Sequence, residues 1–288
     1  MKDGKILESL GNIYARLDEY KIAIDFYEQV KSLEEATYSV QLFERLANLK
    51  TKYGVSLFNN SLDKENLAEA KKLISDGISE VEQLINVAGK TSERLSLLGS
   101  GYKRLALVHK DESASRKKAL TNAIKNYKEA FEIDLNKNGK TNYYPLINQA
   151  FLMALERLSK KGGANKLGTA EFKANLVEAK KSADERDKMN PNFWDLAAPA
   201  DFCLLEILLL PKSKKQTSPG QGEEFISYIK RAWDRGGSYF EKKSVEENLD
   251  FFVKMVDASP TTATNRILIL EVLKNVQYKL SKIWEGDE

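Results

Sequence analysis

The chain is poor in the residues that most often carry out chemistry. It has one cysteine, Cys203, and one histidine, His109, among 288 residues. A single cysteine excludes an internal disulfide framework and fits a reducing compartment, and a single histidine excludes a metal site built on a histidine pair. Cys203 lies among apolar residues, where burial raises the pKa of a thiol, and His109 lies at the expected end of a helix. We therefore expect no enzyme activity, no metal and no cofactor.

Long apolar runs and a strong charge of either sign are also missing. The longest apolar patch, 202–210, is interrupted by Glu206 and falls short of the ~18 apolar residues of a membrane span. Lys and Arg number 45 against 42 Asp and Glu, and a net charge of +3 is too weak to indicate nucleic-acid binding. The N-terminus passes into an amphipathic pattern without the apolar core of a signal peptide. These absences predict a cytoplasmic protein that binds neither a membrane nor a nucleic acid.

Proline and glycine are scarce, with six and sixteen residues, and strand-like alternation is rare. Ala, Leu, Glu and Lys, which favour helices, dominate instead. The expected helices share apolar residues at helical spacing. They cover 4–17, 20–33, 38–58, 64–88, a pair around Tyr102 and Ala123, 143–159, 170–188, a helix from Trp194 to Leu208, 223–235, 243–257 and 261–284.

The clearest pattern is a set of apolar residues at fixed spacing that occurs twice. A Leu-Gly pair is followed by a tyrosine three positions after the glycine, and the next helix then carries alanine, tyrosine and a small or branched residue. This is the spacing of a tetratricopeptide repeat, in which the glycine allows a close helix approach and the tyrosines fill the space between antiparallel helices. The two copies are Leu10, Gly11, Tyr14, Ala23, Tyr27 and Val30, and Leu98, Gly99, Tyr102, Ala123, Tyr127 and Ala130.

The recurrence predicts a solenoid, because a lone repeat cannot bury its apolar face. We expect an all-α, tetratricopeptide-like helical-repeat solenoid of about twelve antiparallel helices. It would be one continuous domain over 1–288, with clearer repeats in 1–135 and divergent helical repeats in 136–288. Ala123 follows Tyr102 by 21 positions, whereas the first copy has nine in the same place, and we expect the excess to form an elongated turn over 110–115.

Two stretches in the middle of the chain, 93–103 and 142–150, carry a further resemblance. The second begins Asn-Tyr-Tyr-Pro-Leu-Ile-Asn, and a later segment, 192–196, reads Asn-Phe-Trp-Asp-Leu. Together they resemble the central, TRAF-binding helical-repeat region of apoptosis signal-regulating kinases and similar bacterial tetratricopeptide proteins, over about 92–256. Leu146 stands where that pattern has glycine, and no kinase signature occurs, so the resemblance implies no catalysis. It implies a regulatory or docking module of a signalling or defence complex.

The first helices of successive repeats line the concave face of a helical solenoid, which suits an extended peptide or a helix. Asn12 and Arg16 are the candidates on the first such helix, and Ser100, Lys103 and Arg104 are those on its recurrence. Asn12 can equally be a solvated helix residue. Glu8 stands where tetratricopeptide clamps for a C-terminal carboxylate have lysine, which disfavours that kind of partner.

Aromatic residues offer a second candidate surface. Tyr143, Tyr144 and Trp194, with Phe193, form a group that either anchors a partner or packs between helices. The lysines of 212–215 form either a solvated loop or a contact for an acidic partner.

These observations favour a non-catalytic scaffold that binds a protein or peptide and can associate with an effector enzyme. The alternative is a sensor that binds a nucleotide or another anionic small ligand between repeats, through Lys103, Arg104 and the basic residues 116–118. A third function, RNA binding, is disfavoured by the charge balance.

Overall fold

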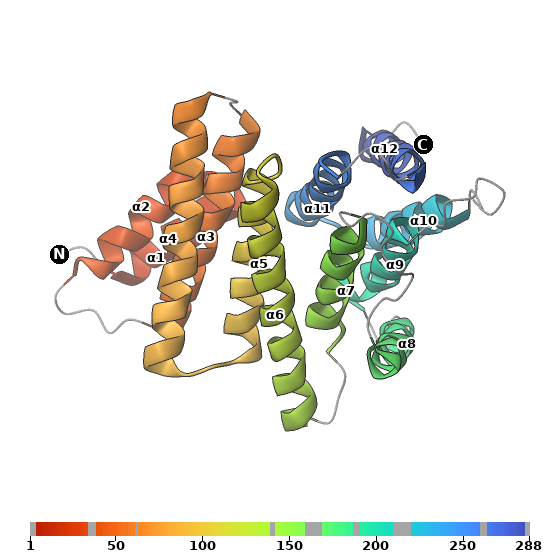
Figure 1. Ribbon diagram of the computed structural model, residues 1–288. Helices are drawn as coiled ribbons and strands as arrows, with labels where there is room; N and C mark the ends of the chain where they lie inside the picture. Colours follow the sequence, from red (N-terminus) through yellow and green to blue (C-terminus); the bar gives the residue numbers. More distant parts are fainter. Residues whose placement is uncertain are drawn as a thin grey trace. The chain divides into compact units, whose positions relative to one another are not determined.

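The computed structural model describes residues 4–33, 39–60, 63–138, 142–158, 169–186, 191–209, 220–259 and 264–285. Within these ranges the chain forms twelve α-helices and no β-strand (Figure 1). The helices are α1 (Gly4–Arg16), α2 (Tyr20–Lys31), α3 (Val40–Asn60), α4 (Lys64–Ala88), α5 (Ser92–Val108), α6 (Ser113–Asn138), α7 (Tyr143–Leu158), α8 (Ala170–Arg186), α9 (Phe193–Leu208), α10 (Gly220–Asp234), α11 (Tyr239–Asp257) and α12 (Thr264–Glu285). The predicted all-α fold is confirmed.

Side-chain caps explain several helix starts. The Asp63 carboxylate accepts a hydrogen bond from the backbone N–H of Asn66 (2.8 Å), and Asn192 exchanges hydrogen bonds with Asp195 in a capping box. Helix α11 starts earlier than the predicted residue 243, because the backbone N–H of Ser238 donates to the carboxylate of Glu241 (3.0 Å) and so fixes the helix start there.

The chain divides into two compact units, Met1–Ile133 and Asp134–Glu288, whose boundary falls inside α6. We call them unit 1 and unit 2. The prediction of one continuous domain stays a prediction, and each unit is described by itself.

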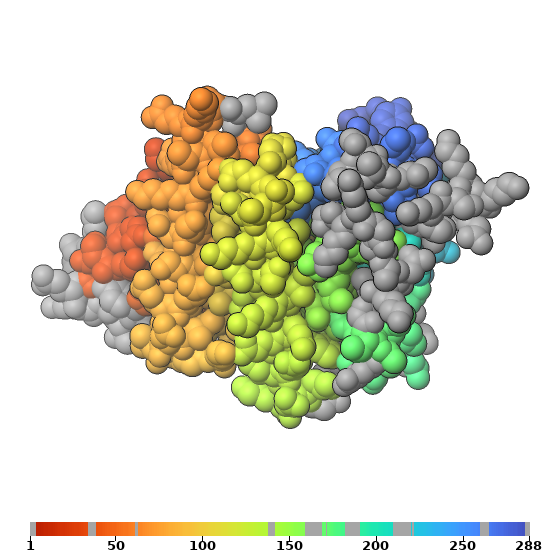
Figure 2. Space-filling model, viewed as in Figure 1, coloured from red at the N-terminus to blue at the C-terminus, as the bar shows by residue number. Residues whose placement is uncertain are grey.

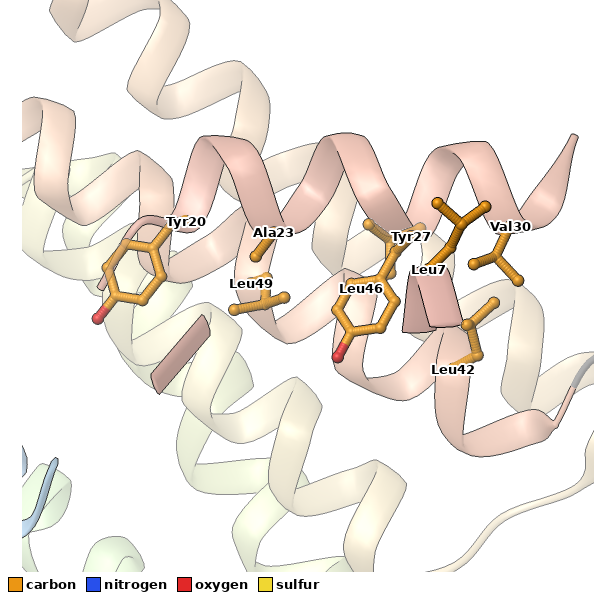
Figure 3. Close-up of a cluster of buried hydrophobic side chains, with 8 residues drawn as sticks. All are labelled: Leu7, Tyr20, Ala23, Tyr27, Val30, Leu42, Leu46 and Leu49. Carbon is orange, nitrogen blue, oxygen red and sulfur yellow. The ribbon is translucent and has the colours of Figure 1, made fainter. Parts of the chain in front are cut away.

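In unit 1 the first hairpin, α1 with α2, packs on α3. Its core contains apolar residues from all three helices, and none is more than 8% exposed (Figure 3). They are Leu7, Tyr20, Ala23, Tyr27, Val30, Leu42, Leu46 and Leu49. Helices α3 and α4 form an extensive helix pair, and α5 contacts both. Helices α4, in orange, and α6, in yellow to yellow-green, form much of the surface of unit 1 that Figure 2 shows.

The repeat motif performs the predicted packing in both copies. A Cβ on Gly11 would lie 3.2 Å from the ring of Tyr27, and a Cβ on Gly99 would lie 2.8 Å from the ring of Tyr127. Both tyrosines are fully buried. The glycines therefore let each tyrosine lie flat against the facing helix.

The middle hairpin, α3 with α4, uses the same device with different residues. A Cβ on Gly54 would lie 2.6 Å from the side chain of Ile74 and 2.7 Å from the carbonyl oxygen of Ala70. Ala70 and Ile74 occupy the spacing that Ala23 and Tyr27 have in the first hairpin, and both are completely buried. Both helices of this hairpin were predicted, at 38–58 and 64–88. The Leu-Gly-x-x-Tyr motif did not identify them as a repeat, because Tyr53 precedes Gly54, Leu57 stands three positions after it and Ile74 replaces the tyrosine of the second helix.

The prediction of an elongated turn over 110–115 is wrong. Helix α5 continues to Val108 and α6 begins at Ser113, so the turn is only 109–112. The backbone N–H of Arg116 already donates to the carbonyl of Glu112 (2.9 Å). The extra residues lengthen both helices, because the polar sequence after Glu112 forms a solvated helix as readily as a loop.

Unit 2 is built around α9, which packs against α7, α8 and α10. Pro145 lies in the first turn of α7, where a missing N–H costs nothing, and Pro199 lies inside α9 and is buried. The ring of Phe151 of α7 meets Phe252 of α11 edge-on at 4.9 Å between centroids.

Candidate binding face of unit 1

Asn12 connects the first three helices. Its Oδ1 accepts a hydrogen bond from the hydroxyl of Tyr27 (2.8 Å) and another from Nη1 of Arg45 (3.2 Å). The same guanidinium nitrogen of Arg45 lies 3.2 Å from Oε1 of Glu8. Asn12 is therefore a structural residue that orients Arg45, rather than a solvated helix residue.

Arg104 makes the corresponding connection from α5 to α3. Its Nη1 donates to Oδ1 of Asn48 (2.9 Å) and to Oγ1 of Thr51 (2.8 Å). The side chain is half-buried, so it holds the two helices together while part of it stays accessible.

The two connections belong to a recurring pattern that the sequence analysis missed. Glu8, Asn12 and Arg16 on α1 have the same four-residue spacing as Glu44, Asn48 and Lys52 on α3, and this spacing puts each set on one face of its helix. In each set the glutamate and the asparagine accept hydrogen bonds from arginine side chains. These arginines lie on the first helix of the following hairpin. These are Arg45 for the set on α1, and Arg94 and Arg104 for the set on α3.

The last position of each set is basic. Arg16 is exposed, and Nζ of Lys52 lies 5.7 Å from the centroid of the Tyr20 ring, a cation–π contact. The side chain of Arg45 is 46% exposed although its guanidinium is held by two hydrogen bonds. We define the polar face of unit 1 as Asn12, Arg16, Arg45, Asn48, Lys52 and Arg104.

Two further candidates, Ser100 and Lys103, lie beside Arg104 on α5 and are half-buried. Ser100 follows Gly99 as Asn12 follows Gly11, so the structure places it at the equivalent position of the third hairpin.

The basic residues proposed for an anionic ligand contact different elements. Arg104 points to α3, as described above, whereas Nη1 of Arg116 donates to the backbone carbonyl of Lys110 at the turn between α5 and α6. Burial lowers the pKa of Arg116. Lys117 and Lys118 are exposed on α6.

Residues 19–153 match a family model described as Tetratricopeptide Repeats-Sensor. The all-α helical-repeat fold of the chain is tetratricopeptide-like. The match extends from the turn before α2 into α7 and so includes α3 and α5, which carry most of the polar face. No curated protein matches the chain. The resemblance of residues 92–256 to apoptosis signal-regulating kinases stays a prediction.

The aromatic candidates of this tetratricopeptide-like protein separate by burial. Phe193 is buried and meets the ring of Trp194 edge-on at 5.1 Å, while Trp194 and Tyr144 are exposed and Tyr143 is half-buried. Core packing therefore accounts for Phe193, whereas Trp194 and Tyr144 expose part of their rings on the surface.

The cysteine and the histidine behave as expected of structural residues. Cys203 is buried in α9, and burial, followed by the nearby carboxylate of Glu224, raises the pKa of its thiol to about 12. His109 caps the end of α5, and its Nδ1 lies 2.8 Å from Oε2 of Glu112. The predicted basic loop 212–215 lies outside the described residues.

No group of three or more His, Cys, Asp or Glu side chains among the described residues is arranged to hold a metal ion. None of the helices there combines the length and the apolar character that a membrane crossing requires.

Proposed function

We propose that this chain is a non-catalytic scaffold whose polar face in unit 1 binds a protein segment that carries acidic side chains. The observation that supports this most directly is Arg45, which is held by Glu8 and Asn12 yet keeps nearly half of its side chain exposed. A cation that is already fixed in place loses little conformational entropy when it binds a carboxylate.

The composition of the face supports the same class of partner. Arg16, Arg45, Lys52 and Arg104 contribute four positive charges, and Asn12 and Asn48 contribute neutral amides. Glu8 is an acidic residue that contacts the face, and its charge is compensated by Arg45. Such a surface favours an acidic segment and gives it a salt-dependent association rate.

Binding to an array of short peptides with acidic, neutral and basic composition tests this proposal, with fluorescence anisotropy to measure the Kd of the peptides that bind. In the double variant Arg16→Ala plus Lys52→Ala we expect the Kd of acidic peptides to rise at least about tenfold, because two of the positive charges of the face are lost. Lys125→Ala, at an exposed lysine on α6, is the matched control and should leave the Kd unchanged. Equal affinity of the double variant and the wild type would overturn the assignment of this face.

Arg104 needs a separate variant because it also joins α5 to α3. Arg104→Lys keeps the positive charge but cannot donate to Asn48 and Thr51 with the same geometry. We expect Arg104→Ala to weaken binding and lower stability together, so the peptide measurement is made only on variants with a wild-type circular dichroism spectrum.

A second candidate function is a sensor for a nucleotide or another anionic small ligand. The description of the matched family as a sensor favours it, and Lys103, Arg104 and the basic residues 116–118 are the residues that would bind the anion. Thermal-shift measurements with nucleotides at saturating concentration test this, because a ligand that binds the folded state raises the midpoint. An unchanged midpoint in every nucleotide would reject the sensor in favour of the scaffold.

The wider setting is also a proposal. The resemblance over 92–256 supports a cytoplasmic regulatory or docking module of a signalling or defence complex, which can associate with an effector enzyme. Tyr143, Tyr144 and Trp194 would supply a second contact surface in unit 2, since exposed tyrosine and tryptophan commonly dominate binding energy.

A further inference from the structure

Helix α1 carries a line of apolar residues that the core of the first hairpin does not use. Ile6, Ile13 and the following turn residue Leu17 are 58%, 54% and 60% exposed, and Leu10 is half-buried. Their spacing of four, three and four residues puts them on one side of the helix. We call these four residues the apolar stripe. Their centre lies about 90° around the helix from the buried Leu7, so the stripe is distinct from the side of α1 that packs on α2.

The same stripe occurs on α3. It is found by aligning α3 with α1 on their two sets of glutamate, asparagine and basic residue. Glu8 of α1 and Glu44 of α3 are 36 positions apart, and so are Asn12 and Asn48. The same offset relates each residue of the apolar stripe to an apolar or aromatic residue of α3. These equivalents are Leu42 for Ile6, Leu46 for Leu10, Leu49 for Ile13 and Tyr53 for Leu17.

On α3 the stripe is covered by α2. Leu42, Leu46 and Leu49 are at most 6% exposed and share one core cluster with four residues of the second helix, and Tyr53 packs against the same cluster (Figure 3). The two helices run antiparallel, because Lys31 at the end of α2 lies over Phe43 and Lys52 of α3 lies over Tyr20 at the start of α2. The covering residues are Tyr20, Ala23, Tyr27 and Val30.

Helix α5 shows the same arrangement a further time. The Leu-Gly-x-x-Tyr motif aligns Leu98 with Leu10 and Gly101 with Ile13. Leu98 is 5% exposed, and a Cβ on Gly101 would lie 2.8 Å from the side chain of Ile78 on α4. In both cases the stripe of a first helix is covered by the second helix of the preceding hairpin. The stripe on α1 is the one that stays exposed.

We propose that the apolar stripe of α1 binds one amphipathic helix of a partner protein, antiparallel to α1 and with the packing pattern of α2. This pattern has an aromatic, a small, an aromatic and a branched residue at successive spacings of three, four and three. A small residue at the second position lets the two helices approach closely, as Ala23 does. Arg16 stands where α3 has Lys52, which lies over the ring of Tyr20, so the first aromatic of the partner helix would meet the guanidinium of Arg16.

The charges beside the stripe favour a different protein over a second copy of this chain. Lys5 and Arg16 lie only about 20° apart around the helix, on the same flank of the stripe. In an antiparallel pair of α1 helices with Ile6 opposite Leu17, Lys5 of one copy would come within two positions of Arg16 of the other. Such an offset is about 3 Å along the helix axis, so like charges would meet at both ends of the contact.

A peptide with the sequence of residues 19–33 is the probe for this site, because α2 already covers the equivalent stripe. A lactam bridge between Lys21 and Asp25, which are exposed in α2 and four positions apart, holds so short a peptide helical. Fluorescence anisotropy of the labelled peptide with the full chain should show saturable binding below about 200 µM, the range of a single-helix contact. A peptide with Ala23→Glu should not bind. No binding of the parent peptide would overturn the proposal.

Variants of the protein locate the peptide. Ile13→Glu should weaken binding at least about tenfold, because it places a carboxylate at the centre of the stripe. Ile267→Glu on α12 is the matched control, since Ile267 is 59% exposed, and it should bind as the wild type does. A peptide that displaced α2 from α3 would be unaffected by Ile13→Glu, so equal affinity of this variant and the wild type would overturn the assignment.

Sedimentation velocity of the full chain without peptide distinguishes the partner helix from a second copy. At about 5 to about 200 µM the protein should keep its monomer mass of 32.6 kDa. A dimer that Ile13→Glu abolishes would assign the stripe to a second copy and overturn the proposal. The acidic-peptide assay of the polar face uses the double variant Arg16→Ala plus Lys52→Ala, whereas this assay uses Ile13→Glu, which changes no residue of the polar face. Failure of either proposal is therefore distinguishable from failure of the other.

Discussion

Arg94 of α5 and Glu44 of α3 form a nearly buried ion pair, with 2.9 Å between Nε and Oε1 and side chains that are 10% and 9% exposed. Nη1 of Arg94 also donates to the backbone carbonyls of Ala88 (2.8 Å) and Gly89 (2.7 Å) at the end of α4. One guanidinium therefore joins α5 to the two helices of the preceding hairpin. Its hydrogen bonds compensate much of the cost of removing both charges from water.

Removal of Arg94 is expected to destabilise the protein strongly. Arg94→Ala leaves a buried carboxylate without its counter-charge and two carbonyls without a donor, which costs about 3–5 kcal/mol. Glu44→Gln should cost less, because the amide oxygen still accepts from Arg94. Urea unfolding followed by far-UV circular dichroism measures both. Lys128→Ala, at an exposed lysine of α6, is the control, and an Arg94→Ala variant as stable as this control would contradict the prediction.

The two motif glycines should respond differently to alanine. In Gly99→Ala the new methyl group would lie 2.8 Å from the ring of Tyr127, which is fully buried and cannot move freely. Overpacking costs about 1–3 kcal/mol and exceeds the ~1 kcal/mol that alanine gains over glycine in a helix. In Gly11→Ala the distance to Tyr27 is 3.2 Å, and the two effects should nearly cancel. The urea midpoints of the two variants test this prediction. A larger loss of stability in Gly11→Ala than in Gly99→Ala would contradict it.

Alkaline pH should weaken the contact between Tyr102 and Glu82. The Tyr102 hydroxyl donates to Oε1 of Glu82 (2.8 Å), and burial, followed by this hydrogen bond, raises the pKa of Tyr102 from 10.0 to about 12. A raised folded-state pKa means that the protonated tyrosine stabilises the fold fully below about pH 10, and that this contribution disappears as pH rises from 10 to 12.

Tyr102→Phe removes this titration. Between about pH 9 and about pH 11.5 its urea midpoint should fall less than that of the wild type, because the variant has no proton to lose at this position. The other tyrosines are the same in both proteins, so their contributions cancel in the comparison. Equal falls in the two proteins would show that Tyr102 does not contribute.

Cys203 should be unreactive in the folded protein. Burial raises the pKa of its thiol from 9.0 to about 12, so at about pH 8 the thiolate fraction is lower by a factor of about 1,000. Reaction with a chromogenic disulfide should be undetectable over minutes in native buffer and rapid in urea. Rapid reaction of the native protein would contradict both the burial and the raised pKa.

The local structure followed from the sequence wherever neighbouring residues decide it. Helices α4 and α9 begin near the predicted positions because Asp63 and Asn192 cap them, and the Leu-Gly-x-x-Tyr motif specifies its own close packing through Gly11 and Gly99. The candidate site was predicted only in part. Asn12 and Arg104 do lie on the polar face, but their intramolecular partners were not foreseen.

Those partners depend on the register between helices. Glu44 and Arg94 are 50 positions apart, and Asn48 and Arg104 are 56 apart. A charge pattern on α3 alone does not specify which of its residues an arginine of α5 reaches, because a shift of one helical turn would bring Asn48 to the place of Glu44. The elongated turn was mispredicted for a related reason, since the polar sequence after Glu112 is compatible with both a loop and an exposed helix.

By itself, the sequence determined the helical class, the positions of most helices and the close packing within the first and third hairpins. These features depend on side-chain spacing over one or two helical turns, where the chain geometry leaves little choice. Only the tertiary structure decided how the hairpins are joined. The burial of Arg94 and Glu44, the placement of Arg45 between Glu8 and Asn12, and the exposure of the apolar stripe all depend on which surfaces meet, and surfaces far apart in sequence meet only when the whole core is packed.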